Sequence, residues 1–136
     1  MCGFSGTFNT RGIEDRTVTA KMTSQLLHRG PDEIWSLDLK CISAKLARLG
    51  MNGLGRGWQP ATDSSGRYIA LTNGEIYNSL ALRESLSMGD STNAVDVAVI
   101  PELFMHKGVK GLELIDGQFS TMILDTVEEC IFLARD

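Results

Sequence analysis

The chain has 136 residues, a length typical of a single domain. Hydrophobic residues make up 43% of it and charged residues 22%, a composition that favours a packed core and excludes a disordered segment. Its 17 acidic and 13 basic residues give a net charge of -4, so we do not expect non-specific binding to nucleic acid. No apolar run approaches the roughly 20 residues of a membrane span, and the start of the chain lacks a signal-peptide pattern. We therefore expect a cytoplasmic protein that binds neither nucleic acid nor membranes.

The cysteines and histidines argue against structural cross-links. There are three cysteines, Cys2, Cys41 and Cys130, an odd number at wide spacing, whereas a disulfide framework is normally even and dense. No Cys-x-x-Cys pair occurs, and His28 and His106 lie far apart. Zinc ligands come in closer local pairs, so the sequence predicts no metal site.

Hydrophobic periodicity predicts the elements of the first half. A helix is expected over 14–28, because apolar residues recur every four positions there, at Val18, Met22 and Leu26. This spacing places them on one face of the helix. Gly30 and Pro31 then break the chain into a turn. The strands expected in this half are 3–8, 34–39 and 42–49.

A long irregular loop over 50–66, rich in glycine, separates the two halves. Asn78 is expected to cap a helix that runs to about Leu86, and Pro101 is expected to kink or shorten a helix over 95–106. The other elements expected here are a strand over 68–72, a polar loop over 88–93, and a terminal hairpin of strands 118–124 and 130–134. Strands at both ends with helices between them predict an α+β fold.

Cys2 carries distinctive chemistry because it is one residue from the start of the chain. Removal of Met1 leaves a thiol and a free α-amine on the same residue. A model α-amine titrates near pH ~7.7–8.0, so it can be neutral and accept the thiol proton. That arrangement is a nucleophile with its own general base, although a cysteine at position 2 is by itself most often chance.

Two further segments join polar groups to glycines. Residues 28–32 read His-Arg-Gly-Pro-Asp, and 71–78 join a strand to a helix through Asn73-Gly74-Glu75. An Asn side chain and a following Gly N–H at such a junction can both donate to one oxyanion. An Asn-Gly pair alone is more often an ordinary turn.

In their order along the chain, these motifs resemble the glutaminase domain of class II glutamine amidotransferases. The similarity is greatest to asparagine synthetases of the glutamine-using type. The matching stretches are Met1-Cys2-Gly3, His28 to Asp32, Arg48-Leu49, Gln59-Pro60, Asn73 to Asn78, Asp116 to Phe119 and Ala134-Arg135-Asp136.

The resemblance implies the N-terminal-nucleophile αββα sandwich, with two antiparallel sheets between helical layers. It implies that Cys2 attacks the glutamine side-chain amide to give a thioester and ammonia, and that Asn73 and Gly74 form the oxyanion hole. It further implies binding roles for four charged residues. Arg48 holds the substrate carboxylate, Asp96 and Glu75 the ammonium, and Arg29 orders the region around the thiol.

The same resemblance sets expectations for partners and cofactors. Glutamine is the expected substrate, and a synthetase domain or subunit is expected to receive the ammonia. No cofactor is expected in this domain, 1–136, which we expect to be incomplete at its C-terminus relative to the family. ATP and Mg²⁺ are expected only in a synthetase domain outside this chain. A homodimer is left open.

Two alternatives remain at this point. The chain is either the glutaminase or a non-catalytic module that regulates or docks a synthetase partner, and the set Cys2, Arg48, Asn73, Gly74 and Asp96 favours the enzyme. A hydrolase of another amide is the second alternative, and the pairing of Arg48 with Asp96 favours an amino-acid zwitterion over it.

Overall fold

The computed structural model describes residues 2–50, 58–89 and 95–136, and its strands form two antiparallel sheets. The first sheet has the order β1-β3-β2, with β1 Gly3–Phe8, β2 Glu33–Asp38 and β3 Ile42–Arg48. The second has the order β4-β5-β6-β7, with β4 Ala61–Thr62, β5 Tyr68–Ile76, β6 Gly117–Asp125 and β7 Cys130–Arg135.

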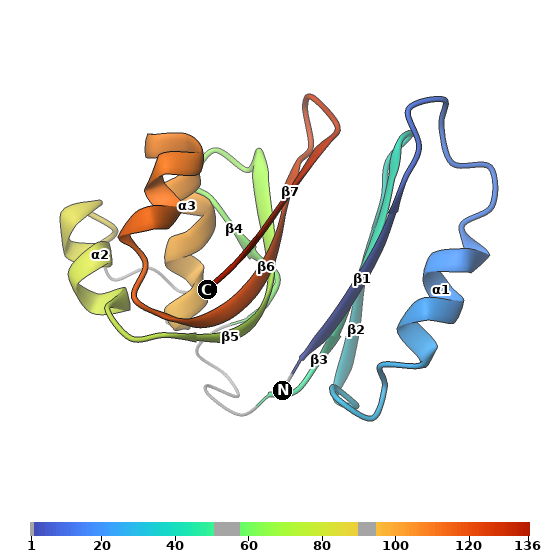
Figure 1. The fold of residues 1–136 in the computed structure, drawn as a ribbon, viewed down its shortest axis with the longest axis horizontal. Helices are drawn as coiled ribbons and strands as arrows, with labels where there is room; N and C mark the ends of the chain where they lie inside the picture. Colours follow the sequence, from blue (N-terminus) through green and yellow to red (C-terminus); the bar gives the residue numbers. More distant parts are fainter. Residues whose placement is uncertain (1, 51–57, 90–94) are drawn as a thin grey trace.

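Helices cover the outer face of each sheet, so the layers run helix, sheet, sheet, helix (Figure 1). Helix α1 (Thr17–Ser24) covers the first sheet; α2 (Ser79–Ser85) and α3 (Val99–Lys107) cover the second. Two 3₁₀ segments, η1 (Asp96–Ala98) and η2 (Gly108–Leu114), flank α3. The predicted α+β sandwich is therefore confirmed. No helix within the described ranges has the length and hydropathy to cross a bilayer.

Alternation along β5 divides the core into two parts. Leu71 faces the first sheet, where it joins a buried cluster with Leu46, Met122 and Cys2. Its neighbour Ala70 faces α3 and joins the second cluster. Since side chains alternate between the two faces of a strand, Asn73 follows Leu71 onto the side between the sheets.

The predicted apolar face of the first helix is wrong, and the helix is shorter than expected. Val18 and Met22 are 45% and 43% exposed, whereas Thr19 and Thr23 are buried. The reason is the polar surface of β1 beneath the helix. Ser5 Oγ hydrogen-bonds Thr23 Oγ1 at 2.7 Å, and the Thr7 and Thr19 hydroxyls pair at 2.8 Å. Two hydroxyl pairs therefore join α1 to the sheet.

The middle of the chain differs from expectation at several points. The expected loop over 50–66 contains β4, and its residues 51–57 lie outside the described residues, as do 90–93 of the polar loop. The strand expected to end at Thr72 continues to Ile76 as β5. The helical segment 108–114 was not predicted.

The starts of α2 and α3 also differ from expectation. Asn78 occupies the N-cap position of α2 but makes no capping hydrogen bond. Its amide instead bridges the segment before β6: Nδ2 donates to Leu114 O at 2.9 Å, and Asp116 N donates to Oδ1 at 3.0 Å. Pro101 lies in the first turn of α3, where an N–H has no intrahelical acceptor. The α-helix accordingly begins at Val99.

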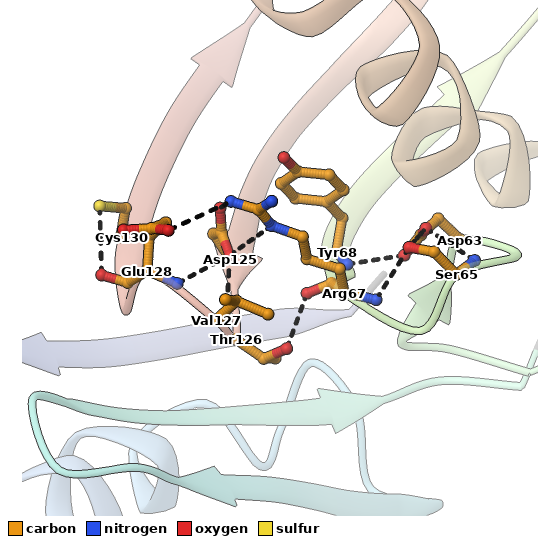
Figure 2. A network of polar contacts seen from close by, with 9 residues as sticks. All are labelled: Asp63, Ser65, Arg67, Tyr68, Asp125, Thr126, Val127, Glu128 and Cys130. Atoms are coloured by element: carbon orange, nitrogen blue, oxygen red, sulfur yellow. Dashed lines mark hydrogen bonds and ion pairs between the residues drawn. The ribbon is translucent and has the colours of Figure 1, made fainter.

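A polar network fixes the end of β5 near Tyr68 (Figure 2). The Arg67 guanidinium donates to both carboxylate oxygens of Asp125, at 2.9 and 2.6 Å. Asp125 Oδ1 also accepts the N–H groups of Val127 and Glu128 in the β6–β7 turn, both at 3.0 Å. This network ties β5 to the turn of the terminal hairpin.

Candidate active site

A cavity of about 210 Å³ opens between the two sheets, near the Ile76 end of β5. The polar network of Figure 2 lies at the other end of this strand. The cavity brings together six of the seven predicted site residues, which come from four separate segments of the chain. Its lining residues are Cys2, Arg48, Leu49, Gln59, Thr72, Asn73, Gly74, Glu75, Val95, Asp96 and Gln118. Arg29 is the predicted residue that does not line it.

Cys2 precedes β1 and is held at the end of β3. Cys2 is 8% exposed and belongs to the cluster between the sheets. The pairing of Gly3 with Ala47 brings the sulfur next to the residues that follow β3. The Leu49 N–H donates to Cys2 Sγ, with 3.5 Å between nitrogen and sulfur. A buried thiol thus lines the cavity and is held by the backbone of the residue after β3.

The turn at 28–32 supports Cys2 from outside the cavity. Arg29 Nε donates to the carbonyl oxygen of Cys2 at 3.4 Å. Gly30 packs on the backbone of β3 so closely that a Cβ there would lie 2.2 Å from Ala47 O. Only glycine allows this approach. Arg29 therefore contacts Cys2 through the carbonyl oxygen of Cys2.

Asp32, at the end of the same turn, fixes the backbone on both sides of Leu49. Its N–H donates to Arg48 O at 3.1 Å, and its Oδ2 accepts the Gly50 N–H at 2.7 Å. The turn therefore fixes the backbone at the end of β3, and with it the position of Arg48 in the cavity lining.

Arg48 faces Glu33 directly across the β2–β3 pairing. Its Nη1 lies 3.2 Å from Glu33 Oε2. The Arg48 side chain is 15% exposed, whereas that of Glu33 is 58% exposed. Because Glu33 is largely in solvent, this ion pair is weak. A guanidinium has five donors, so Arg48 can bind a second carboxylate beside Glu33.

Asn73 lines the cavity beside Gly74. Its Oδ1 is buried and has no hydrogen-bond partner among the described residues. The Nδ2 end of the same amide is the donor, and Asn73 lines the cavity with Cys2. An Asn side chain at this position has a donor for an oxygen bound next to the sulfur.

Gly74 cannot be replaced without displacing the neighbouring strand. Its φ is 146°, and a Cβ there would lie 2.1 Å from Gln118 O and 2.5 Å from Phe119 Cα. Residues with a side chain rarely adopt this backbone conformation. The glycine lets β5 pass close against β6 at the cavity wall.

Along the edge of β5 that faces β4, two backbone N–H groups beyond the short β4 pairing are bonded by side chains. The Thr72 N–H donates to Gln59 Oε1 at 3.1 Å, and the Ile76 N–H donates to Asp96 Oδ2 at 2.6 Å. Alternate N–H groups of a strand share one edge, which assigns the Gly74 N–H to the edge between these two. No side chain of residues 2–50, 58–89 or 95–136 accepts a hydrogen bond from it.

Acidic groups line the part of the cavity nearest Ile76. Asp96 begins η1 and is fixed through Oδ2, which leaves Oδ1 as a further acceptor. Glu75 is exposed beside Gly74. With Arg48 also in the lining, the cavity carries both signs of charge, as a zwitterion requires. Among the described residues, no three His, Cys, Asp or Glu side chains gather as a metal site would require.

Five lining residues have no predicted role: Leu49, Gln59, Thr72, Val95 and Gln118. Leu49, Gln59 and Gln118 fall within the matching stretches of the sequence, but nothing in the pattern shows what they contact. Leu49 acts through its backbone, so no side-chain signal exists for it.

Comparison with solved structures confirms the fold. The chain superposes on glutamine phosphoribosylpyrophosphate amidotransferase from Bacillus subtilis, complexed with ADP and GMP, with a TM-score of 0.67. The match covers 99% of this chain and 36% of that one at 16% sequence identity. At that identity the likeness concerns the fold alone, and it confirms the predicted N-terminal-nucleophile sandwich.

Sequence comparison gives the family. Residues 1–136 match the family described as glutamine amidotransferase domain. The chain is 33% identical over 141 residues to Bacillus subtilis asparagine synthetase [glutamine-hydrolyzing] 2, and 32% identical over 143 residues to Escherichia coli asparagine synthetase B [glutamine-hydrolyzing]. Both matches cover 100% of this chain but only 19% and 25% of those relatives. The family match covers every residue of the chain, and the chain therefore belongs to the glutamine amidotransferase domain family.

Proposed function

We propose that this domain hydrolyses the side-chain amide of glutamine to glutamate and ammonia, with Cys2 as the nucleophile. The observation that carries the proposal is the cavity in which Cys2, Asn73 and Gly74 meet Arg48 and Asp96. A nucleophile, two donors for an oxyanion and a charge pair for an amino acid are the parts that the reaction needs.

The reaction proceeds in two halves. The Cys2 thiol passes its proton to its own α-amine, and the sulfur attacks the amide carbon. The carbonyl oxygen becomes an oxyanion, to which Asn73 Nδ2 and the Gly74 N–H donate. The carbon–nitrogen bond then breaks, and ammonia leaves with the proton that the α-amine had accepted. Water attacks the remaining γ-glutamyl thioester, which releases glutamate and returns the thiol.

Binding of the amino-acid end follows the charges of the cavity. Arg48 pairs with the substrate α-carboxylate, for which a planar guanidinium is suited. Asp96 accepts from the α-ammonium through Oδ1, and Glu75 adds negative charge beside it. Arg29 acts indirectly, since it holds the Cys2 carbonyl.

We further propose that the ammonia is used in an ATP-dependent amidation of the asparagine-synthetase type. The supporting observation is the similarity along the whole chain to glutamine-hydrolyzing asparagine synthetases from several organisms. The chain spans about a quarter of those proteins or less, so the synthetase step takes place outside the residues described here.

The experiment compares the wild-type protein with Cys2→Ala. Glutamate release from glutamine is measured by a coupled assay, and thermal melting shows whether the fold is retained. We expect Cys2→Ala to be inactive with an unchanged melting temperature. Release at the wild-type rate would refute Cys2 as nucleophile. A wild-type protein no faster than Cys2→Ala would favour the non-catalytic docking module.

A further inference from the structure

Gln59 occupies a position where a strand residue would be expected. The β4–β5 pairing ends at Ala61, opposite Ala70, and the same register continued by two residues places Gln59 opposite Thr72. The Thr72 N–H is bonded by the Gln59 side chain, through Oε1 at 3.1 Å. The side chain therefore takes the place of a main-chain acceptor at the strand edge, next to Asn73.

This hydrogen bond fixes which way round the Gln59 carboxamide lies. An N–H group can pair only with an acceptor, and the carbonyl oxygen is the sole acceptor of a glutamine side chain. Oε1 is therefore committed to Thr72, and Nε2 remains as a donor. Gln59 lines the Cys2 cavity, and no residue of the described ranges accepts a hydrogen bond from its Nε2.

Along the edge of β5, Gln59 lies on one side of Gly74 and Asp96 on the other. Asp96 is bonded to the Ile76 N–H and Gln59 to the Thr72 N–H, with Gly74 midway between them. The two side chains differ in what they present to the cavity: Asp96 offers a carboxylate oxygen, and Gln59 offers an N–H donor. The carboxylate of Asp96 is suited to the substrate ammonium. The donor of Gln59, on the other side of Gly74, is suited to an oxygen that becomes negatively charged during the reaction.

We propose that Gln59 is a third catalytic donor, whose Nε2 hydrogen-bonds the oxyanion that forms when Cys2 attacks the substrate carbonyl. The inference rests on the proposed glutaminase function. In this arrangement one carboxamide does two things: Oε1 holds Thr72, and thereby the strand that carries Asn73 and Gly74, while Nε2 stabilises the reacting oxygen.

Two substitutions separate these roles. Gln59→Glu has nearly the same shape and keeps an acceptor for the Thr72 N–H, but it replaces the donor with a carboxylate oxygen. Gln59→Met removes both. Loss of one oxyanion donor costs about 10²–10³-fold in kcat. We expect both variants to lose about 10²-fold or more in kcat at pH 8 and to keep KM within about threefold, because the contact forms only in the transition state.

The controls test charge and fold. Gln25 is exposed at the end of α1, so Gln25→Glu and Gln25→Met introduce the same changes away from the cavity and should leave kcat unchanged. Melting temperatures of all variants are measured in parallel, on the full natural chain. We expect Gln59→Glu to melt at the wild-type temperature because its hydrogen bond to Thr72 is retained.

Each other outcome overturns the inference. Wild-type kcat in Gln59→Glu shows that Gln59 only holds Thr72. Wild-type kcat in Gln59→Met shows that no donor is needed. A raised KM with unchanged kcat places the contact on a non-reacting part of the substrate. A wild-type protein no faster than Cys2→Ala refutes the proposed function itself, and the inference with it, whereas the first three outcomes leave that function intact.

Discussion

The backbone N–H of Leu49 points at the sulfur of Cys2, with 3.5 Å between them. This contact joins the residue before β1 to the residue after β3. The next residue, Gly50, is held by a hydrogen bond from its N–H to the Asp32 carboxylate. The sulfur is therefore held by the backbone from one side. Its reactivity depends on the base that takes its proton, and this leads to the first prediction.

Retention of Met1 should slow the reaction by about 10²–10⁴-fold, the usual contribution of general-base catalysis. With Met1 in place, the nitrogen of Cys2 belongs to a peptide bond and has no basic lone pair. Intact-mass measurement distinguishes the two forms, and treatment with an aminopeptidase should restore activity. If the form that carries Met1 hydrolyses glutamine as fast as the processed form, the free-amine mechanism is wrong.

Arg48→Ala should raise the KM for glutamine by about one to two decades, since a hydrogen-bonded charge pair contributes about 1.5–3 kcal/mol. Arg48→Lys keeps the charge but loses the planar fork, and we expect an intermediate KM. Loss of the ion pair with Glu33 should by itself cost little stability, because Glu33 is exposed. Steady-state kinetics provide the test, and an unchanged KM in Arg48→Ala would show that another group binds the carboxylate.

Gly30→Ala should destabilise the protein by about 1–3 kcal/mol, the usual cost of overpacking. The added Cβ would lie 2.2 Å from Ala47 O and force the turn away from β3. Because that turn also carries Arg29 and Asp32, glutaminase activity should fall as well. Gly89→Ala is the matched control, as nothing lies within 4 Å of its added Cβ. Urea unfolding measures both, and equal stability of the two variants would contradict the prediction.

The Arg67–Asp125 pair should make stability depend on pH in the acid range. Hydrogen bonds from Arg67 lower the pKa of Asp125, and the N–H groups of Glu128 and Val127 act in the same direction against the effect of burial. The unfolded chain binds the proton more readily, so this stabilisation is complete well above pH ~3.9, the unfolded value. It is lost as pH falls through the lower folded pKa.

Asp125→Asn should remove that part of the pH dependence and cost about 1.5–3 kcal/mol at pH 7. Urea unfolding of both proteins between about pH 5 and pH 2 measures the effect. The difference in unfolding free energy should shrink as the pH falls. A difference that stays constant over this range would show that the carboxylate charge contributes nothing. Glutaminase activity at pH 7 serves as the control, since the network lies away from Cys2.

Sequence patterns predicted most of the strands, because alternation and turn residues are local signals. They failed where the partner surface mattered. The periodicity predicts that Val18 and Met22 lie on the buried face of the first helix, which holds only against an apolar partner surface. The surface of β1 instead presents Ser5 and Thr7 to the helix. Hydroxyl pairs across 12 to 18 residues leave no trace in hydrophobic periodicity.

The candidate site was predicted through family motifs, and the structure gathers all of it but Arg29 in one cavity. What the motifs leave out is contact through the backbone. The roles of Leu49 and Thr72 lie in their N–H groups, which every residue but proline possesses. Gln59 was part of a matching stretch, but its contact depends on where β4 stops, and a two-residue strand carries no sequence signal.

The side chains along the edge of β5 that faces β4 have a consequence for divergence within the family. Gln59 and Asp96 come from segments outside the strand, yet they determine which of its N–H groups are occupied. Substitutions in those segments can therefore change the number and charge of groups around the Cys2 thiol while every strand pairing is preserved. An evolving domain of this type has a route to new amide substrates that leaves its folding core untouched.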